Sequence, residues 1–164
     1  MPRLYHATRR DLPLNQAIIG QERTTKPIDL EFDARRPEDV TPRSRALFSS
    51  DDPAFAFVYL MAECAICRGQ LLLYEVDMPC ATKHPMILVS HAQRFLRMPA
   101  TLEQIITEYW NPTCEWKCWE YLGDAMTPTA DEVMPDIFMQ AGAKHRYGED
   151  LVLARQLWPC PAPA

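Results

Sequence analysis

Long apolar runs are missing from this sequence. The longest, residues 54–62, is bracketed by acidic residues and falls well short of the about 20 apolar residues that cross a bilayer. The N-terminus also lacks the apolar core of a secretory signal peptide. These two absences predict a cytoplasmic protein with no membrane partner.

An excess of basic charge is missing as well. The 164 residues carry a formal net charge of -5, which disfavours binding of nucleic acid by a broad positive surface. A local basic patch is compatible with this balance, because the first third of the chain contains Arg9, Arg10, Arg35, Arg36, Arg43 and Arg45. No internal repeat is visible, and the length suits a single domain over residues 1–164, with about two-thirds of its unfolded surface buried.

Six cysteines raise the question of a metal site. Cys64 and Cys67 form a C-x-x-C pair, and Cys114 and Cys118 form a second, more widely spaced pair. Four thiolates could bind structural zinc, but the two pairs are loosely spaced and the first falls where a helix is expected. Small buried side chains are the favoured interpretation, so we expect no metal and, without a secretory signal, no disulfide framework.

Fifteen prolines against five glycines divide the chain into short elements. Apolar runs predict strands at residues 3–8, 46–49, 71–78, 86–89, 119–122 and 150–158. Residues 13–45 are expected to be irregular, because Pro27, Pro37 and Pro42 and a run of mixed charge interrupt any regular pattern. A mixed α+β fold built from short strands follows from this pattern.

Two main helices are predicted, and they span residues 53–67 and 101–110. Asp52 is the expected N-cap of the first helix, with Pro53 at its first position and Gly69 beyond its end. Thr101 and Gln104 have the spacing of a capping box at the start of the second helix.

Five polar positions stand out against this background. His6 follows an apolar strand, Ser49 and Ser50 precede a helix, and Tyr59 lies within that helix. Each of them also has a structural interpretation, as a satisfied hydrogen-bonding group, a turn residue or a core residue. Glu120 has aromatic neighbours on both sides, where burial of a carboxylate is costly unless the group is paired or used. Strand alternation could instead place Glu120 on the solvent face.

In this order, four segments resemble the ADP-ribosyltransferase superfamily, and its small bacterial members such as the rifampin-modifying transferases most of all. Tyr5-His6-Ala7-Thr8-Arg9 is similar to the first motif, an aromatic residue followed by His-Gly-Thr. Leu47-Phe48-Ser49-Ser50 is similar to the second, a strand with an aromatic residue and Ser before a helix. Tyr74-Glu75-Val76-Asp77 resembles the strand after that helix, and Trp119-Glu120-Tyr121-Leu122 resembles the third motif of the His-Tyr-Glu class.

The resemblance implies a split, strongly bent β-sheet that holds nicotinamide adenine dinucleotide (NAD) in a cleft. His6 would hydrogen-bond a ribose of the dinucleotide, and the backbone at Ala7 would hold the nicotinamide amide. Thr8 and Arg9 would face the adenylate or pyrophosphate side, where an arginine can bind two phosphate oxygens at once.

The chemistry implied by the resemblance is transfer of ADP-ribose from NAD to an acceptor, with release of nicotinamide. Phe48 or Tyr59 would supply a ring that stacks on nicotinamide, and Ser49 would complete the second motif. Glu120 would bind a ribose hydroxyl and stabilise the oxocarbenium-like transition state with its negative charge. The acceptor could be a protein, a nucleic acid or a small molecule.

The sequence departs from the family at three places. Ala7 replaces a glycine and Leu47 replaces the stacking tyrosine, which leaves open a non-catalytic nucleotide-binding or interaction protein. In the rifampin group an aspartate after the strand carries the acidic role, so Asp77 competes with Glu120. An RNA 2'-phosphotransferase shares the opening motif, but the net charge of -5 and the lack of a second histidine motif count against it.

Overall fold

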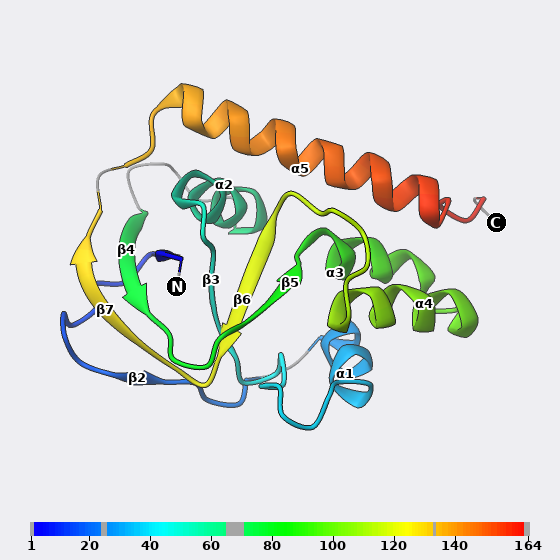
Figure 1. The fold of residues 1–164 in the computed structure, drawn as a ribbon, viewed down its shortest axis with the longest axis horizontal. Helices are drawn as coiled ribbons and strands as arrows, with labels where there is room; N and C mark the ends of the chain where they lie inside the picture. The colour runs from blue at the N-terminus through cyan, green and yellow to red at the C-terminus, as the bar shows by residue number, and fades with distance from the viewer. Residues whose placement is uncertain (1, 24–25, 65–70, 133, 163–164) are drawn as a thin grey trace.

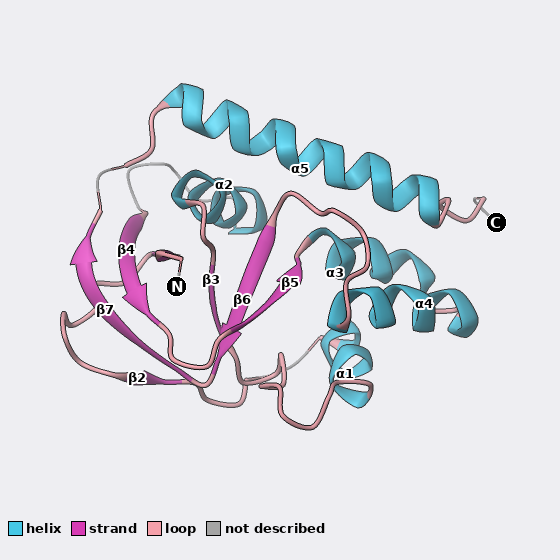
Figure 2. Ribbon diagram, viewed as in Figure 1, coloured by secondary structure: helices cyan, strands magenta, loops and turns pink. Residues whose placement is uncertain are grey.

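The structure, a computed structural model, describes residues 2–23, 26–64, 71–132 and 134–162. Within these ranges the chain combines five α-helices with antiparallel strands that curl into a half-barrel (Figures 1 and 2). The mixed α+β class predicted from the sequence is confirmed. None of the helices in these ranges has the length and apolar character to cross a bilayer.

The strands of the described residues form two antiparallel sheets. They are β1 (Leu4–Thr8), β2 (Ile18–Ile19), β3 (Leu47–Ser49), β4 (Leu72–Asp77), β5 (Thr82–Pro85), β6 (Trp119–Gly123) and β7 (Ala125–Asp131). One sheet has the order β1-β4-β7-β2 and the other has the order β3-β6-β5. An isolated antiparallel bridge between Tyr5 and Ser50 joins β1 to β3, with backbone hydrogen bonds of 2.7 and 2.9 Å. The first and second sequence motifs therefore lie side by side.

Strand β6 lies between β3 and β5 in the smaller sheet. Its register sets Leu122 opposite Phe48 on one side and Glu120 opposite His84 on the other. Side chains two residues apart share a face of a strand, and both Glu120 and Leu122 are buried. The alternative in which Glu120 faces solvent is therefore excluded.

Most helices surround one end of this half-barrel. They are α1 (Pro27–Ala34), α2 (Pro53–Cys64), α3 (Ile87–Ala92), α4 (Pro99–Trp110) and α5 (Ile137–Leu157), with a short 3-10 helix, η2 (Gln93–Phe95), after α3. Helix α2 packs on β1 and on α5, while α3 contacts α1, α4 and α5 (Figure 1). Asp52 begins α2 as predicted, because its Oδ1 accepts the backbone N–H groups of Ala54 and Phe55 at 2.9 and 3.1 Å.

The principal core lies between α1, α3, α4 and the smaller sheet. Phe32, Ile105 and Tyr109 are all fully buried there, and the Tyr109 ring meets Phe32 edge-on with centroids 4.8 Å apart. Burial of each such side chain contributes about 1.5–3 kcal/mol. This packing fixes α4 against β6, which places Tyr109 beside Glu120.

Two predicted strands are wrong. Residues 86–89 do not form a strand, because β5 ends at Pro85 and α3 begins at Ile87. Residues 150–158 largely belong to α5, where Ala143, Asp150 and Ala154 are buried at helical spacing. Short apolar runs have the same composition in a buried strand and in a buried helix, so they do not distinguish the two. Two main helices were expected, and the described residues contain five α-helices.

The segment expected to be irregular contains β2 and α1. Pro27, which suggested a break, lies at the start of α1, where a missing N–H costs nothing. Helix α4 ends at Trp110 as predicted but begins at Pro99, so the capping box at Thr101 is wrong. Strands β5 and β7 were not predicted, and each contains a proline. The predicted end of α2 near Cys67 lies outside the described residues.

Candidate functional site

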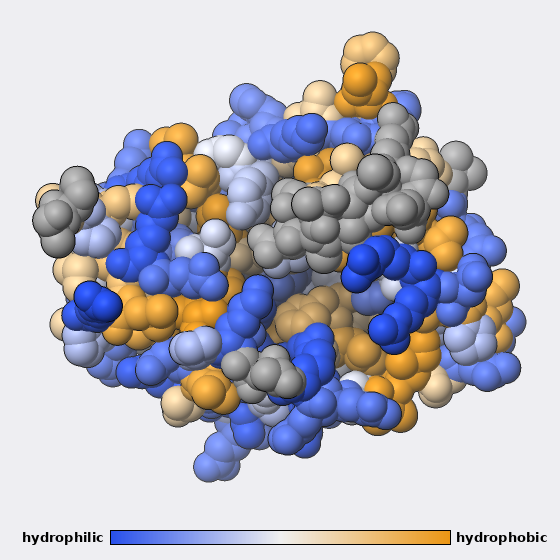
Figure 3. All heavy atoms as spheres, turned by 180° about the vertical axis from the view of Figure 1, so that it is seen from behind, coloured by the Kyte–Doolittle hydropathy of each residue, from blue (hydrophilic) through white to orange (hydrophobic). Residues whose placement is uncertain are grey.

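The molecule is hollowed on the side opposite to that of Figure 1, where hydrophilic side chains surround a more apolar floor (Figure 3). A pocket of about 380 Å³ lies between β1, β3 and α2, a size typical of small-molecule sites. It is lined by Tyr5, His6, Ala7, Arg23, Lys26, Asp29, Arg43, Phe48, Ser49, Ser50, Ala56, Tyr59, Leu60, Met86 and Glu120. Segments from the first, second and third sequence motifs thus share one cavity.

His6 is held by the neighbouring strand. Its Nδ1 lies 2.6 Å from the carbonyl oxygen of Phe48, and a carbonyl oxygen only accepts, so Nδ1 carries the proton and donates. Burial lowers the pKa of His6, although the bond to Phe48 opposes that change. The ring is therefore neutral at neutral pH, and its Nε2 is a hydrogen-bond acceptor. A sugar hydroxyl is a suitable donor to that nitrogen.

Arg43 is the centre of a buried ionic network. Its Nε donates to Asp29 Oδ1 at 3.0 Å, and its Nη1 donates to the Tyr109 hydroxyl at 2.5 Å and to Glu120 Oε1. The guanidinium also lies over the Phe48 ring, 5.0 Å from its centroid. Burial opposes the charge, but Glu120, Tyr109 and Asp29 together raise the pKa of Arg43 above its ordinary value. Arg43 stays charged and is paired with both carboxylates.

Glu120 is 2% exposed and is held from two sides. Its Oε1 accepts from Arg43 Nη1 and, at 2.5 Å, from the Tyr109 hydroxyl. The described residues supply no hydrogen-bond donor to Oε2 of this carboxylate. Asp29, Arg43 and Glu120 sum to one negative charge. The network therefore fixes the orientation of the carboxylate, and these three side chains together remain net negative.

Two neutral groups support this arrangement. Burial raises the pKa of Tyr109 well above its ordinary value, so its hydroxyl remains a donor. His84 Nδ1 donates to the Tyr109 carbonyl oxygen at 3.0 Å, and the Thr82 hydroxyl donates to His84 Nε2 at 2.9 Å. Burial lowers the pKa of His84 to about 4, so its ring is neutral where it stacks on Tyr109.

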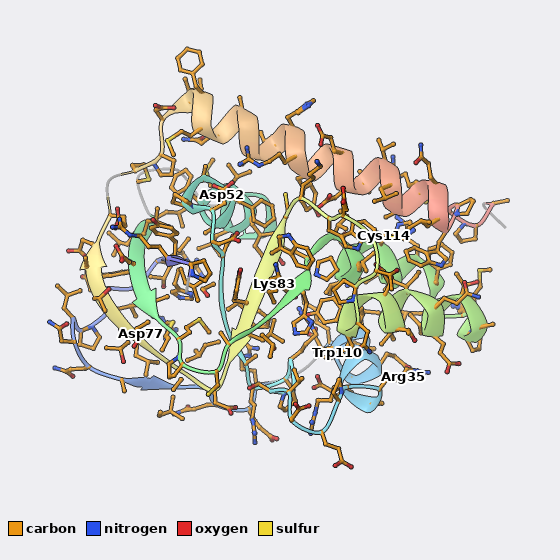
Figure 4. The ribbon with its side chains drawn as sticks, viewed as in Figure 1. Arg35, Asp52, Asp77, Lys83, Trp110 and Cys114 are labelled. Carbon is orange, nitrogen blue, oxygen red and sulfur yellow. The ribbon has the colours of Figure 1, made fainter. Side chains whose placement is uncertain are left out.

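Most of the residues singled out from the sequence line this pocket. They are His6, Ala7, Phe48, Ser49, Tyr59 and Glu120. Thr8 and Arg9, expected at the pyrophosphate, are not among the lining residues, because they lie at and just beyond the end of β1. Asp77 is exposed at the end of β4 and does not line the pocket either (Figure 4). Of the two candidate acidic residues, Glu120 is the one that the fold brings to the cavity.

Sequence reasoning missed several charged residues of the site. Arg23 and Lys26 lie before α1, Asp29 lies within it, and Arg43 follows it, in a stretch that was expected to be irregular. Arg43 belonged to the group of arginines in the first third of the chain, but no local pattern distinguishes it from the others. Its role depends on contacts with Tyr109 and Glu120, which are distant in sequence.

The four cysteines considered as zinc ligands are only partly described. Cys67 and the side chain of Cys64 lie outside the described residues. Cys114 (Figure 4) and Cys118 are free thiols, and burial raises the pKa of Cys118 to about 12, which disfavours the thiolate that zinc requires. No three His, Cys, Asp or Glu side chains cluster as metal ligands within the part of the chain that the structure describes.

Comparison of the chain with protein-family models, with curated proteins and with solved structures gives no match. The interpretation of the pocket therefore depends on its own residues and on the resemblance of the sequence motifs. Both bear on the same cavity.

Proposed function

We propose that this chain binds NAD in the pocket between β1, β3 and α2 and transfers ADP-ribose to an acceptor, releasing nicotinamide. The observation that carries the proposal is the meeting of His6, two aromatic side chains and Glu120 in one cavity, from four separate elements. Phe48 and Tyr59 are the two aromatic residues, and either ring could stack on nicotinamide.

The charge of the cluster formed by Asp29, Arg43 and Glu120 suits this reaction. As nicotinamide leaves, positive charge develops on the ribose, and a fixed negative group next to it stabilises the transition state. Arg43 satisfies one oxygen of Glu120, while Asp29 offsets the positive charge of Arg43. The carboxylate is thus held in place without loss of the net negative charge of the cluster.

In this proposal the phosphates of the dinucleotide lie near Arg23 and Lys26, and not near Arg9 as the sequence motifs implied. Arg23 and Lys26 are both exposed and line the pocket, whereas Arg9 does not line it. Arg23 Nη2 donates to the Arg43 carbonyl oxygen at 2.8 Å, which holds the guanidinium at the rim. Cations at the rim are suited to phosphate oxygens, because charge-assisted hydrogen bonds are stronger than neutral ones.

A second candidate is a nucleotide-binding protein without turnover. The pairing of Glu120 with Arg43 favours it, since a carboxylate engaged by a guanidinium has less capacity to stabilise a new positive charge. Ala7 favours it too, because its methyl group narrows the approach of nicotinamide to the backbone.

The two candidates differ in one product. The purified chain is incubated with NAD, and free nicotinamide is measured by chromatography, while binding of NAD is followed by calorimetry. The transferase proposal predicts release above the rate of NAD alone. Binding without any release favours the non-catalytic candidate, and absence of both contradicts the assignment of the pocket to NAD.

A further inference from the structure

A second cavity of about 140 Å³ adjoins the first. The two cavities share six lining residues, namely Lys26, Asp29, Arg43, Tyr59, Met86 and Glu120. The Arg43–Glu120 pair is therefore a common wall, and a group in either cavity lies against it.

The remaining walls of the second cavity come from Ile28 of α1, a helix that also lines the first cavity through Asp29, and from three elements that take no part in the first. Val89 and Ser90 belong to α3, Gln93 to η2 and Tyr147 to α5. Ser90 and Gln93 are exposed, so this side of the cavity is accessible from solvent. Apart from the shared Tyr59 and Glu120, no residue that the sequence analysis assigned to the first pocket lines the second cavity.

Displacement at the anomeric carbon of the ribose requires space on both faces of the ring, one for the leaving group and one for the acceptor. Nicotinamide departs on one face of the ribose, and the acceptor attacks from the opposite face. Two cavities that share Glu120 are suited to these two approaches, with the dinucleotide on the β1 and β3 side and the acceptor on the α3 and α5 side.

We propose that the second cavity is the acceptor subsite and that it takes a small, uncharged, hydroxyl-bearing group. This inference rests on the proposed transferase function. A cavity of roughly 150 Å³ holds a molecule the size of benzene, so the group that enters has about six non-hydrogen atoms.

The charge and chemistry of the walls select a neutral group. Lys26 and Arg43 offset Asp29 and Glu120, so the four ionic side chains sum to zero. Arg43 is already engaged by both carboxylates, which disfavours its use for an anionic acceptor. The Ser90 hydroxyl and the Gln93 amide can orient a hydroxyl as donors or acceptors.

The step balances without a further reactant. The bond from the ribose anomeric carbon to the nicotinamide nitrogen breaks, and its electron pair leaves with nicotinamide. A lone pair of the acceptor oxygen forms the new bond to that carbon. The hydroxyl proton is released to water through the exposed side at Ser90 and Gln93.

The test uses glycerol, a neutral hydroxyl compound of the stated size, and agmatine, which carries a guanidinium. The native chain is incubated with NAD and each probe, and ADP-ribosyl adducts and free ADP-ribose are measured by mass spectrometry. The variant Ser90→Trp fills the second cavity from an exposed helix position. Glu103→Trp, at an exposed position of α4 whose side chain makes no hydrogen bond among the described residues, is the matched control.

For the native chain we expect a glycerol adduct and little agmatine adduct. Ser90→Trp should lower the adduct-to-hydrolysis ratio by about tenfold or more, while nicotinamide release into water continues, because water is smaller than the blocked group. Glu103→Trp should retain the native ratio. An unchanged ratio in Ser90→Trp, or a preference for agmatine, overturns the subsite while leaving the transferase function standing. No nicotinamide release from the native chain overturns both.

Discussion

Replacement of Arg43 by methionine tests the buried network more severely than any other single change. Methionine retains much of the apolar volume of the side chain but removes the charge. Glu120, 2% exposed, then loses its only cationic partner among the described residues, and Asp29 loses its bond to Arg43 Nε. We expect Arg43→Met to be strongly destabilising.

The expected loss in the free energy of unfolding follows from the burial of both Arg43 and Glu120. Arg43 is 7% exposed and Glu120 is 2% exposed, so solvent screening is small. Removal of one partner from such a pair costs about 3–5 kcal/mol, because the remaining charge stays buried. Domains of this size are stable by about 5–15 kcal/mol, so the variant loses a large share of its stability. For this chain length the loss corresponds to a fall in Tm of roughly 6–20 °C.

A double-mutant cycle separates the energy of the Arg43–Glu120 interaction from any general disruption of core packing by the substitutions. Glu120→Gln alone should cost about 1–3 kcal/mol, because Arg43 keeps Asp29 as a partner. The double variant should be more stable than the sum of the two losses predicts by about 1–3 kcal/mol, since it leaves no unpaired Glu120 carboxylate in the core. Urea unfolding at pH 7 measures all four proteins. Losses that simply add would show that Arg43 and Glu120 do not interact as described.

Three further predictions concern the remaining groups of the site. The pKa of His84 is about 4 in the folded chain against 6.5 ordinarily, so the unfolded chain binds more protons between these values and stability should fall on acidification through that range, by up to about 3 kcal/mol. Urea unfolding from pH 7 to pH 4 measures this slope, and an equal slope in His84→Asn would contradict its assignment to His84. His6→Ala should weaken NAD binding by about 1–3 kcal/mol in calorimetry, because it removes the acceptor Nε2, and native affinity in the variant would make His6 structural. Asp77→Asn should leave nicotinamide release at the native rate, because Asp77 is exposed and outside the pocket, and a large loss of rate would return the acidic role to Asp77.

Local signals in the sequence were sufficient to predict β1, β3 and the start of α2, the three elements between which the pocket lies. The strand with His6, the short strand with Phe48 and the Asp52-Pro53 helix start all follow from contiguous residues, and all three are confirmed. The burial of Glu120 could not be decided from alternation, because both faces of β6 are covered and its neighbours Tyr121 and Leu122 are buried as well.

The rest of the site depends on contacts between residues far apart in the chain. Arg43 is 66 residues from Tyr109 and 77 from Glu120, and no local pattern marks such a pairing. Helix α1 was missed because Pro27 and the mixed charge after it also suit a loop, and only its packing through Ile28 and Phe32 favours a helix. The second half of α5 was assigned to a strand because residues 150–158 are a short apolar run, and such a run does not by itself distinguish a strand from a helix.

The most direct measurement is nicotinamide release from NAD by the native chain and by Glu120→Gln, with calorimetry of NAD binding on the same two samples. The amide retains the size of the side chain and removes its charge. The account predicts that release falls by about 10²–10³-fold while most of the affinity for NAD remains. Equal release by the two proteins would contradict it, because the negative charge of Glu120 would then have no part in the reaction.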